Sequence, residues 1–203
     1  MNVPLGKRTF IEEARRAQII ECAIEAIATL GYTRTSLAKI AELAELSPGS
    51  ISYHFGSKDE LIQAVVAEVA MMATSMMEPA IVAQSTATDA LRVYFETNLA
   101  FMDRHRKPLF ALVEIVTHAC GGTETPGPYA AQHETALRDI EKVLAWGRTT
   151  GEFREFDPRS MAIAIRGAVD AVPAELLRNP DLDLELLARE LVTLFTLATR
   201  RRP

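Results

Sequence analysis

Apolar residues recur with the spacing of an α-helix along almost the whole of this 203-residue chain, and no segment alternates apolar and polar residues as a half-buried strand does. In residues 11–30, for example, Ala17, Ile20, Ile24 and Ile27 fall on one helical stripe. Capping and terminating residues divide the chain into about nine such segments, and the sequence shows no internal repeat. The sequence therefore predicts an all-α protein.

The first third of the chain contains signals for four helices, two of them very short. Gly31 ends the first helix as a left-handed terminator, and Ser36 is the N-cap that we expect for the second. Ser47, followed by Pro48, begins a very short third helix. Ser57, with a glutamate three residues later, forms the capping box of a long helix that we expect to end near residue 77. These four helices predict a compact N-terminal unit.

The rest of the chain predicts five longer helices separated by loops. The strongest loop signal is the segment GGTETPGPY at residues 121–129, because glycine and proline break both helices and strands. The five helices are expected over residues 88–105, 108–120, 129–150, 158–177 and 184–199.

Composition and charge argue against several classes of protein. The net charge of −5 means that the molecule as a whole does not attract nucleic acid or acidic membranes. Cys22 and Cys120 show no CxxC spacing, which argues against a disulfide framework or a zinc site. The N-terminus lacks the apolar core of a signal peptide, and no apolar run approaches the length that spans a bilayer. We therefore expect a soluble cytoplasmic protein with no membrane partner.

Residues 36–55, SLAKIAELAELSPGSISYHF, predict a helix-turn-helix. Two short helices that cross steeply need small residues at their closest approach, and Ala41 and Ala44 meet that need. Ile40, Leu46 and Ile51 are then expected to fill the wedge between these helices and the first helix. The alternative is a plain connector built from short helices.

The second short helix has an unusual content for a structural helix, because it is rich in serine and glycine, which are poor helix formers. Its serines, with Tyr53 and His54, offer hydrogen-bonding groups within reach of a DNA major groove, unless Tyr53 is a core residue, as we expect Phe55 to be. Lys58 opposes the dipole of its own helix, which a bound phosphate would explain. Basic residues also cluster near the N-terminus, where an arm could reach phosphates: Lys7, Arg8, Arg15 and Arg16.

The segment GYTRTSLAKIAELAELSPGSISYHFGSKDELIQAVV, residues 31–66, resembles the DNA-binding domain of the TetR (tetracycline-repressor-like) transcriptional regulators. The shared pattern is an aromatic after glycine, a Thr/Ser pair, IA, Ser-x-Gly-x-aliphatic, an aromatic cluster that ends in phenylalanine, and SK with an acid and leucine. Two positions depart from it. Glu45 stands where the turn usually has glycine, and a left-handed backbone there would cost roughly 1 kcal/mol. Ser52 replaces the first ring of the usual aromatic pair, which affects the base preference.

The resemblance implies a DNA-binding domain at residues 1–56 and a ligand-binding and dimerisation domain at residues 57–203. It also implies a homodimer that reads a palindromic operator on double-stranded DNA and releases it when a small apolar or amphipathic effector binds. By position, it implies contacts with DNA phosphates or base edges from Ser36, Lys39, Pro48, Gly49, Ser50, Ser52, Tyr53, His54 and Lys58.

The effector site is predicted from pliable apolar residues and from polar residues inside apolar stripes. Glu114 and His118 share a helix face and could supply two metal ligands, but no third ligand is identifiable, so we predict a hydrogen bond or a pocket anchor rather than a metal site. Arg166 and Asp170 have the same spacing, which is also typical of a helix salt bridge. The full candidate set is Met72, Met76, Phe95, Asn98, Met102, Phe110, Glu114, His118, Trp146, Arg166 and Asp170.

The last two predicted helices are apolar over more than one stripe, so one of their faces can cover a partner subunit. The resemblance implies a symmetric four-helix dimer interface. The residues predicted for it are Ala162, Ile165, Val169, Val172, Leu187, Leu191, Leu194 and Phe195.

These observations predict a transcriptional repressor that is released from its operator by a ligand, located in the cytoplasm and associated with the nucleoid. No nucleophile–base pair or cofactor motif is evident, so we expect neither an enzyme nor a bound cofactor. Two alternatives remain: a helical ligand-binding or adaptor protein without operator binding, and an enzyme that uses Glu114 and His118.

Overall fold

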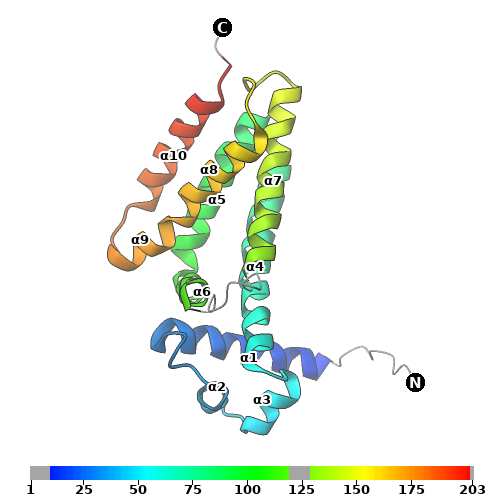
Figure 1. Ribbon diagram of the computed structural model, residues 1–203, viewed down its shortest axis with the longest axis vertical. Helices are drawn as coiled ribbons and strands as arrows, with labels where there is room; N and C mark the ends of the chain where they lie inside the picture. The colour runs from blue at the N-terminus through cyan, green and yellow to red at the C-terminus, as the bar shows by residue number, and fades with distance from the viewer. Residues whose placement is uncertain (1–9, 119–128, 202–203) are drawn as a thin grey trace, which may run out of the picture.

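A computed structural model of the protein describes residues 10–118 and 129–201, which form ten α-helices (Figure 1). Within these ranges the only extended pairing is an isolated bridge between Phe153 and Arg200, so the predicted all-α class is confirmed. The helices are α1 (Phe10–Leu30), α2 (Leu37–Leu43), α3 (Pro48–His54), α4 (Lys58–Val82), α5 (Ala87–Arg104), α6 (Arg106–His118), α7 (Ala130–Thr149), α8 (Pro158–Asp170), α9 (Val172–Arg178) and α10 (Leu184–Thr199).

The N-terminal helices enclose a first hydrophobic core. Ile27 of α1, Ile40 of α2 and Ile51 of α3 are fully buried, as is Phe55 directly after α3. Leu61 adds the first turns of α4 to the same core. Ile40 and Ile51 therefore fill the wedge as expected, while Leu46 is partly buried and packs against the same core.

Helix α6 joins this first core to the rest of the molecule. In Figure 1 it lies between α1 and the bundle of α5, α7, α8, α9 and α10. Ala111 and Ile115 of α6 are fully buried in the first core, and Phe101 of α5 joins them there. The first core thus draws side chains from both sides of residue 57, where the sequence divides the two predicted domains.

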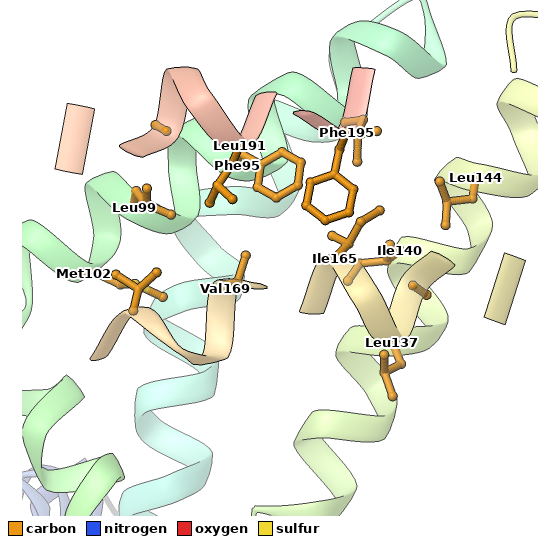
Figure 2. Close-up of a cluster of buried hydrophobic side chains, with 14 of the residues drawn as sticks. Phe95, Leu99, Met102, Leu137, Ile140, Leu144, Ile165, Val169, Leu191 and Phe195 are labelled. Carbon is orange, nitrogen blue, oxygen red and sulfur yellow. The ribbon is translucent and has the colours of Figure 1, made fainter. Parts of the chain in front are cut away.

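The second core lies within the C-terminal bundle (Figure 2). Phe95 of α5 stacks on Phe195 of α10, with 5.2 Å between ring centroids and 20° between ring planes. Leu144 of α7 and Ile165 of α8 are fully buried beside them. These large side chains lie in the interior of the bundle.

The helix ends follow the local sequence signals. The hydroxyl oxygens of Ser36, Ser47 and Ser57 each accept a backbone N–H three residues later, at 3.2, 3.2 and 3.1 Å. Gly31 is left-handed, with φ of 84°. The three predicted N-caps and the predicted terminator are confirmed because each is set by neighbours in sequence.

The two largest differences from the predicted helix boundaries each involve a proline. The helix expected over residues 158–177 is broken at Ala171 into α8 and α9, because Pro173 has no N–H to donate to the carbonyl four residues before it. This break makes ten helices instead of nine. Helix α4, in contrast, continues through Pro79 to Val82 and forgoes one backbone hydrogen bond.

Helix α4 also corrects an expectation about apolar runs. Among the described residues it is the one helix that, by length and composition alone, is apolar enough to cross a bilayer, with a mean hydropathy of 1.4. The charged residues within it were expected to break the run. Leu61 and Val65 in its first turns are fully buried in the first core, which accounts for part of this apolar character.

The turn between α2 and α3 contains the left-handed residue that the sequence suggested. Glu45 has φ of 54°, and it is the one non-glycine residue with positive φ in the described ranges. We expect Glu45→Gly to raise the free energy of unfolding by about 1 kcal/mol, because glycine adopts this conformation without the steric cost of a Cβ atom. Chemical denaturation measures the change. Glu45→Ala is the control: it removes the charge but keeps Cβ, so a comparable gain with alanine would contradict the backbone explanation.

Candidate nucleic-acid interface

Helices α2 and α3 form the predicted helix-turn-helix. Ala41 and Ala44 are almost fully buried where the two helices approach each other. The turn is held by Leu46, whose N–H donates to the Ala41 carbonyl at 2.9 Å, and by Gln18 of α1, whose Nε2 donates to the Ala44 carbonyl at 3.1 Å. α1 therefore fixes the angle at which α3 is presented.

The outer face of α3 is open to solvent. Pro48, Gly49 and Ser52 are exposed, and 74% of the Tyr53 surface is accessible. A Cβ atom on Gly49 would have only the Ser47 hydroxyl, 3.9 Å away, as a neighbour, so a partner's backbone can approach here. The Ser52 hydroxyl donates to the Pro48 carbonyl at 3.3 Å and keeps acceptor capacity for an outside group.

The C-terminal end of α3 is anchored on α1. Arg16 donates to the His54 carbonyl and places its guanidinium 3.9 Å from the centre of the Phe55 ring. The Tyr53 hydroxyl donates to Glu12 at 3.2 Å, and its ring meets the His54 ring edge-on at 5.1 Å. Arg16, which the sequence grouped with a DNA-binding arm, thus has a structural role.

The other basic residues of that group are placed differently. Nη1 of Arg15 donates to Gln18 at 2.8 Å on the exposed side of α1. Lys7 and Arg8 lie outside the described residues. Near α2, Nζ of Lys39 forms a 2.8 Å ion pair with Glu42, so part of its charge is neutralised before any phosphate is bound.

Lys58 has a partner within the chain. Its Nζ donates to the Tyr32 carbonyl at 3.0 Å and lies 4.2 Å from the centre of the Tyr32 ring. Burial lowers the pKa of Lys58, against the opposing effect of Asp59. This contact explains the unfavourable position of Lys58 in the helix dipole without a phosphate, although an ammonium group has two further donors to offer.

Glu114 holds the other backbone polar group of the same residue. The Tyr32 N–H donates to Oε2 of Glu114 at 2.9 Å, and a Cβ atom on Gly31 would lie 3.1 Å from that oxygen. His118 lies 3.6 Å from Glu114 and 42% of its side chain is exposed. The described residues contain no group of three or more potential metal ligands. Glu114 is therefore a link between α6 and the turn after α1.

The predicted effector residues do not gather in one place. Phe95, Asn98 and Met102 are buried in the bundle, and Phe110 and Trp146 pack against the second core. Met72 and Met76, in contrast, pack against the first core.

Arg166 and Asp170 belong to a polar cluster between α5, α7 and α8. Nη2 of Arg166 lies 2.5 Å from Asp170 and donates to the Tyr129 hydroxyl at 2.7 Å. Nδ1 of His133 lies 3.3 Å from the second Asp170 oxygen. Sequence reasoning missed Tyr94, Tyr129 and His133. Tyr94 could have been found, because it lies one helical turn before Asn98 and therefore shares a helix face with that predicted effector residue.

Most of the predicted dimer residues lie inside the subunit. Ala162, Ile165, Val169, Val172, Leu191 and Phe195 are buried in the second core, and Leu187 packs against it. Such side chains cannot contact a partner subunit, so a partner would meet the opposite faces of α8 and α10. Those faces expose Ile163, Leu194 and Leu197, of which 54%, 57% and 65% of the surface is accessible.

Comparisons with known proteins agree with this geometry. The family model described as bacterial regulatory proteins, tetR family, matches residues 19–65. Over 182 residues the chain is 31% identical to the HTH-type transcriptional regulator TtgR of Pseudomonas putida, an alignment that covers 84% of each protein.

Two solved structures have the same fold over most of their length. The transcriptional regulator FadR from Bacillus subtilis, in complex with stearoyl-CoA, has a TM-score of 0.77 at 22% identity and covers 89% of this chain and 97% of its own. AibR, in complex with isovaleryl coenzyme A and operator DNA, has a TM-score of 0.74 at 20% identity, with the same coverage. With a relative this similar over most of both lengths, the chain belongs to the tetR family of bacterial regulatory proteins and is a DNA-binding transcriptional regulator.

Proposed function

We propose that two copies of the chain bind a palindromic operator through α3 and repress transcription until a small apolar or amphipathic effector releases them. The observation that carries this proposal is the open outer face of α3, which α1 holds in place through Arg16 and Gln18. A recognition helix must be exposed and rigidly positioned to read base edges in a major groove.

The sequence predicts a division of labour along the chain, and we retain it in the proposal. We propose that residues 1–56 bind DNA and that residues 57–203 bind the effector and the second subunit. AibR, which has the same fold, has been solved with both isovaleryl coenzyme A and operator DNA, and FadR with stearoyl-CoA. These relatives support control by a small molecule, and we propose that the protein acts in the cytoplasm on the nucleoid.

The backbone of Tyr32 is a route by which effector binding can reach α3. Lys58 of α4 holds its carbonyl and Glu114 of α6 holds its N–H, while Lys107 of α6 pairs with Glu25 of α1 at 2.7 Å. A shift of α4 or α6 would therefore move α1 and, with it, the DNA-binding helices. The effector must bind the operator-free state more tightly than the operator-bound state for this movement to release DNA.

Homodimerisation is proposed from the outward faces of α8 and α10. Ile163 and Leu197 are exposed there, and a Cβ atom added to Gly167 would have no neighbour within 4 Å inside the subunit. Small and apolar residues on two helices allow close approach of a symmetric partner.

The operator interface is tested by Ser52→Glu. We expect at least a tenfold loss of affinity for DNA selected from a random pool by the wild-type protein, because the new carboxylate faces the phosphates and base edges. Ser75→Glu, an exposed serine on α4, is the matched control and should bind within about threefold of wild type. Quantitative band shifts at fixed salt measure both.

Two results would contradict the proposal. If the selection returned no enriched palindrome, the chain would not read an operator. Equal losses in the two variants would place DNA binding elsewhere on the molecule or reduce it to a general charge effect.

A further inference from the structure

The polar cluster in the bundle contains hydrogen-bonding groups that its own residues leave unpaired. The Tyr94 hydroxyl and Nε of Arg166 are buried, and neither has a hydrogen-bond partner within the part of the chain that the structure describes. Tyr94 lies close enough to Arg166 for the guanidinium to act on its pKa, yet the two form no hydrogen bond of ordinary geometry. The large majority of buried polar side-chain atoms in proteins are paired, so two unpaired donors on neighbouring side chains call for an explanation.

The remaining groups of the cluster are already paired with one another. Arg166 and Asp170 form an ion pair, and the Tyr129 hydroxyl accepts from Arg166 and donates to Asp170 at 3.3 Å. Burial raises the pKa of both tyrosine hydroxyls, so they remain protonated donors. Burial alone would lower the pKa of Arg166, but the oxygens of Tyr94, Tyr129 and Asp170 raise it, so the guanidinium stays charged.

This arrangement leaves two unpaired donors, and the opposite charges of Arg166 and Asp170 offset each other. The positive charge of Arg166 is matched by Asp170, so a second carboxylate would place an uncompensated negative charge beside it. An uncharged oxygen acceptor would satisfy Tyr94 and Arg166 at no such cost. The apolar surface needed for the rest of a ligand is close by, since the ring of Tyr94 packs against the second core.

The cluster is also accessible from outside. His133 and Asp170 have 39% and 30% of their side-chain surface exposed, while Arg166 has 15% exposed and the Tyr94 hydroxyl is buried. The three helices that supply these residues, α5, α7 and α8, pack against one another. The cluster therefore extends from partly exposed groups, His133 and Asp170, to the buried Tyr94 hydroxyl.

We propose that this cluster is the polar end of the effector site, and that it selects ligands in which an uncharged carbonyl oxygen is attached to an apolar body. The proposal rests on the ligand control proposed above. The carbonyl oxygen would accept from the Tyr94 hydroxyl and from Nε of Arg166, while the apolar body would lie against the second core.

The test compares probes that share a body and differ in the polar end. One set is nonan-2-one, nonanoate and nonylamine, and the other is acetophenone, benzoate and benzylamine. We expect at least one ketone to raise the melting temperature of the full-length protein and to bind at least tenfold more tightly than its acid and amine partners, measured by calorimetric titration.

Two tyrosine variants separate binding from stability. Tyr94→Phe should lose about tenfold in ketone affinity while its melting temperature without ligand stays the same or rises, because the variant removes an unpaired buried hydroxyl. Tyr129→Phe is the matched control. It should lower the melting temperature without ligand, because its hydroxyl has two partners.

Several results would overturn this inference. They are the absence of binding by either ketone, tighter binding of an acid or amine, or unchanged ketone affinity in Tyr94→Phe. Operator binding is scored separately by band shift in the absence of probes. If the ketones do not bind more tightly than the acids and amines but the protein still binds its operator, only the carbonyl site is rejected. If the protein binds no palindrome, the proposed regulator is rejected.

Discussion

Replacing Gly147 with alanine is expected to lower the free energy of unfolding by about 2 kcal/mol. Gly147 lies in the last turns of α7, and the chain folds back after the helix so that the Phe153 ring rests directly on it. A Cβ atom at this position would lie 2.2 Å from Cδ2 and 2.4 Å from Cε2 of that ring. Phe153 is buried in the second core and its N–H donates to the Gly147 carbonyl at 2.9 Å, so the ring cannot simply move away.

Two opposing effects make up this value. Overpacking a core costs about 1–3 kcal/mol, with contacts this short at the upper end. Alanine gains about 1 kcal/mol over glycine inside a helix, which offsets part of that cost. Urea denaturation measures the balance. A variant as stable as the wild type would show that the ring does not rest on the helix.

The control for this prediction is a second substitution, at the residue that the new methyl group would meet. Phe153→Leu should cost about 1 kcal/mol alone, because it leaves a small cavity. Combined with Gly147→Ala, it should cost less than the sum of the single changes, because a leucine can rotate away from the new methyl group. Additive effects would mean that Gly147 and Phe153 do not share one contact.

The features predicted correctly are those that neighbouring residues determine. The serine caps of α2, α3 and α4 depend on a side chain and an N–H three residues apart, which are visible in any sequence. The left-handed residue at Glu45 was found because the surrounding helix-turn-helix pattern is specific. The exposed face of α3 followed from its serines and glycine.

The features that were missed depend on contacts between distant residues. Arg16 binds a carbonyl 38 residues away and Lys58 binds one 26 residues away, and no periodic pattern encodes either choice. Tyr94 and Arg166 meet only because α5 and α8 share a bundle.

Most of the residues predicted for the outer faces of α8 and α10 proved to be inward for a related reason, whereas Leu194 is outward as predicted. Both helices are apolar on more than one stripe, and such a sequence does not say which stripe the subunit buries and which remains for a partner. Ile165 and Leu191 proved to be inward, whereas Ile163 and Leu194 are outward.

The outward stripe leads to the second large expected effect. For the proposed homodimer, we expect the double variant Leu194→Glu/Leu197→Glu to have an apparent Kd of association at least about a thousandfold higher than that of the wild type. In a symmetric interface each change occurs twice, so four carboxylates would face one another across a surface that is apolar in the wild type. Sedimentation equilibrium measures the association.

The fold of the subunit should survive this change, since 57% and 65% of the two leucine surfaces are accessible within it. Val82→Glu, at an exposed apolar position on α4, is the matched control and should remain dimeric. Operator affinity should fall together with the dimer, because one α3 reads only half of a palindrome. If the double variant stayed dimeric by sedimentation equilibrium and helical by circular dichroism, the interface would not lie on this face of α10.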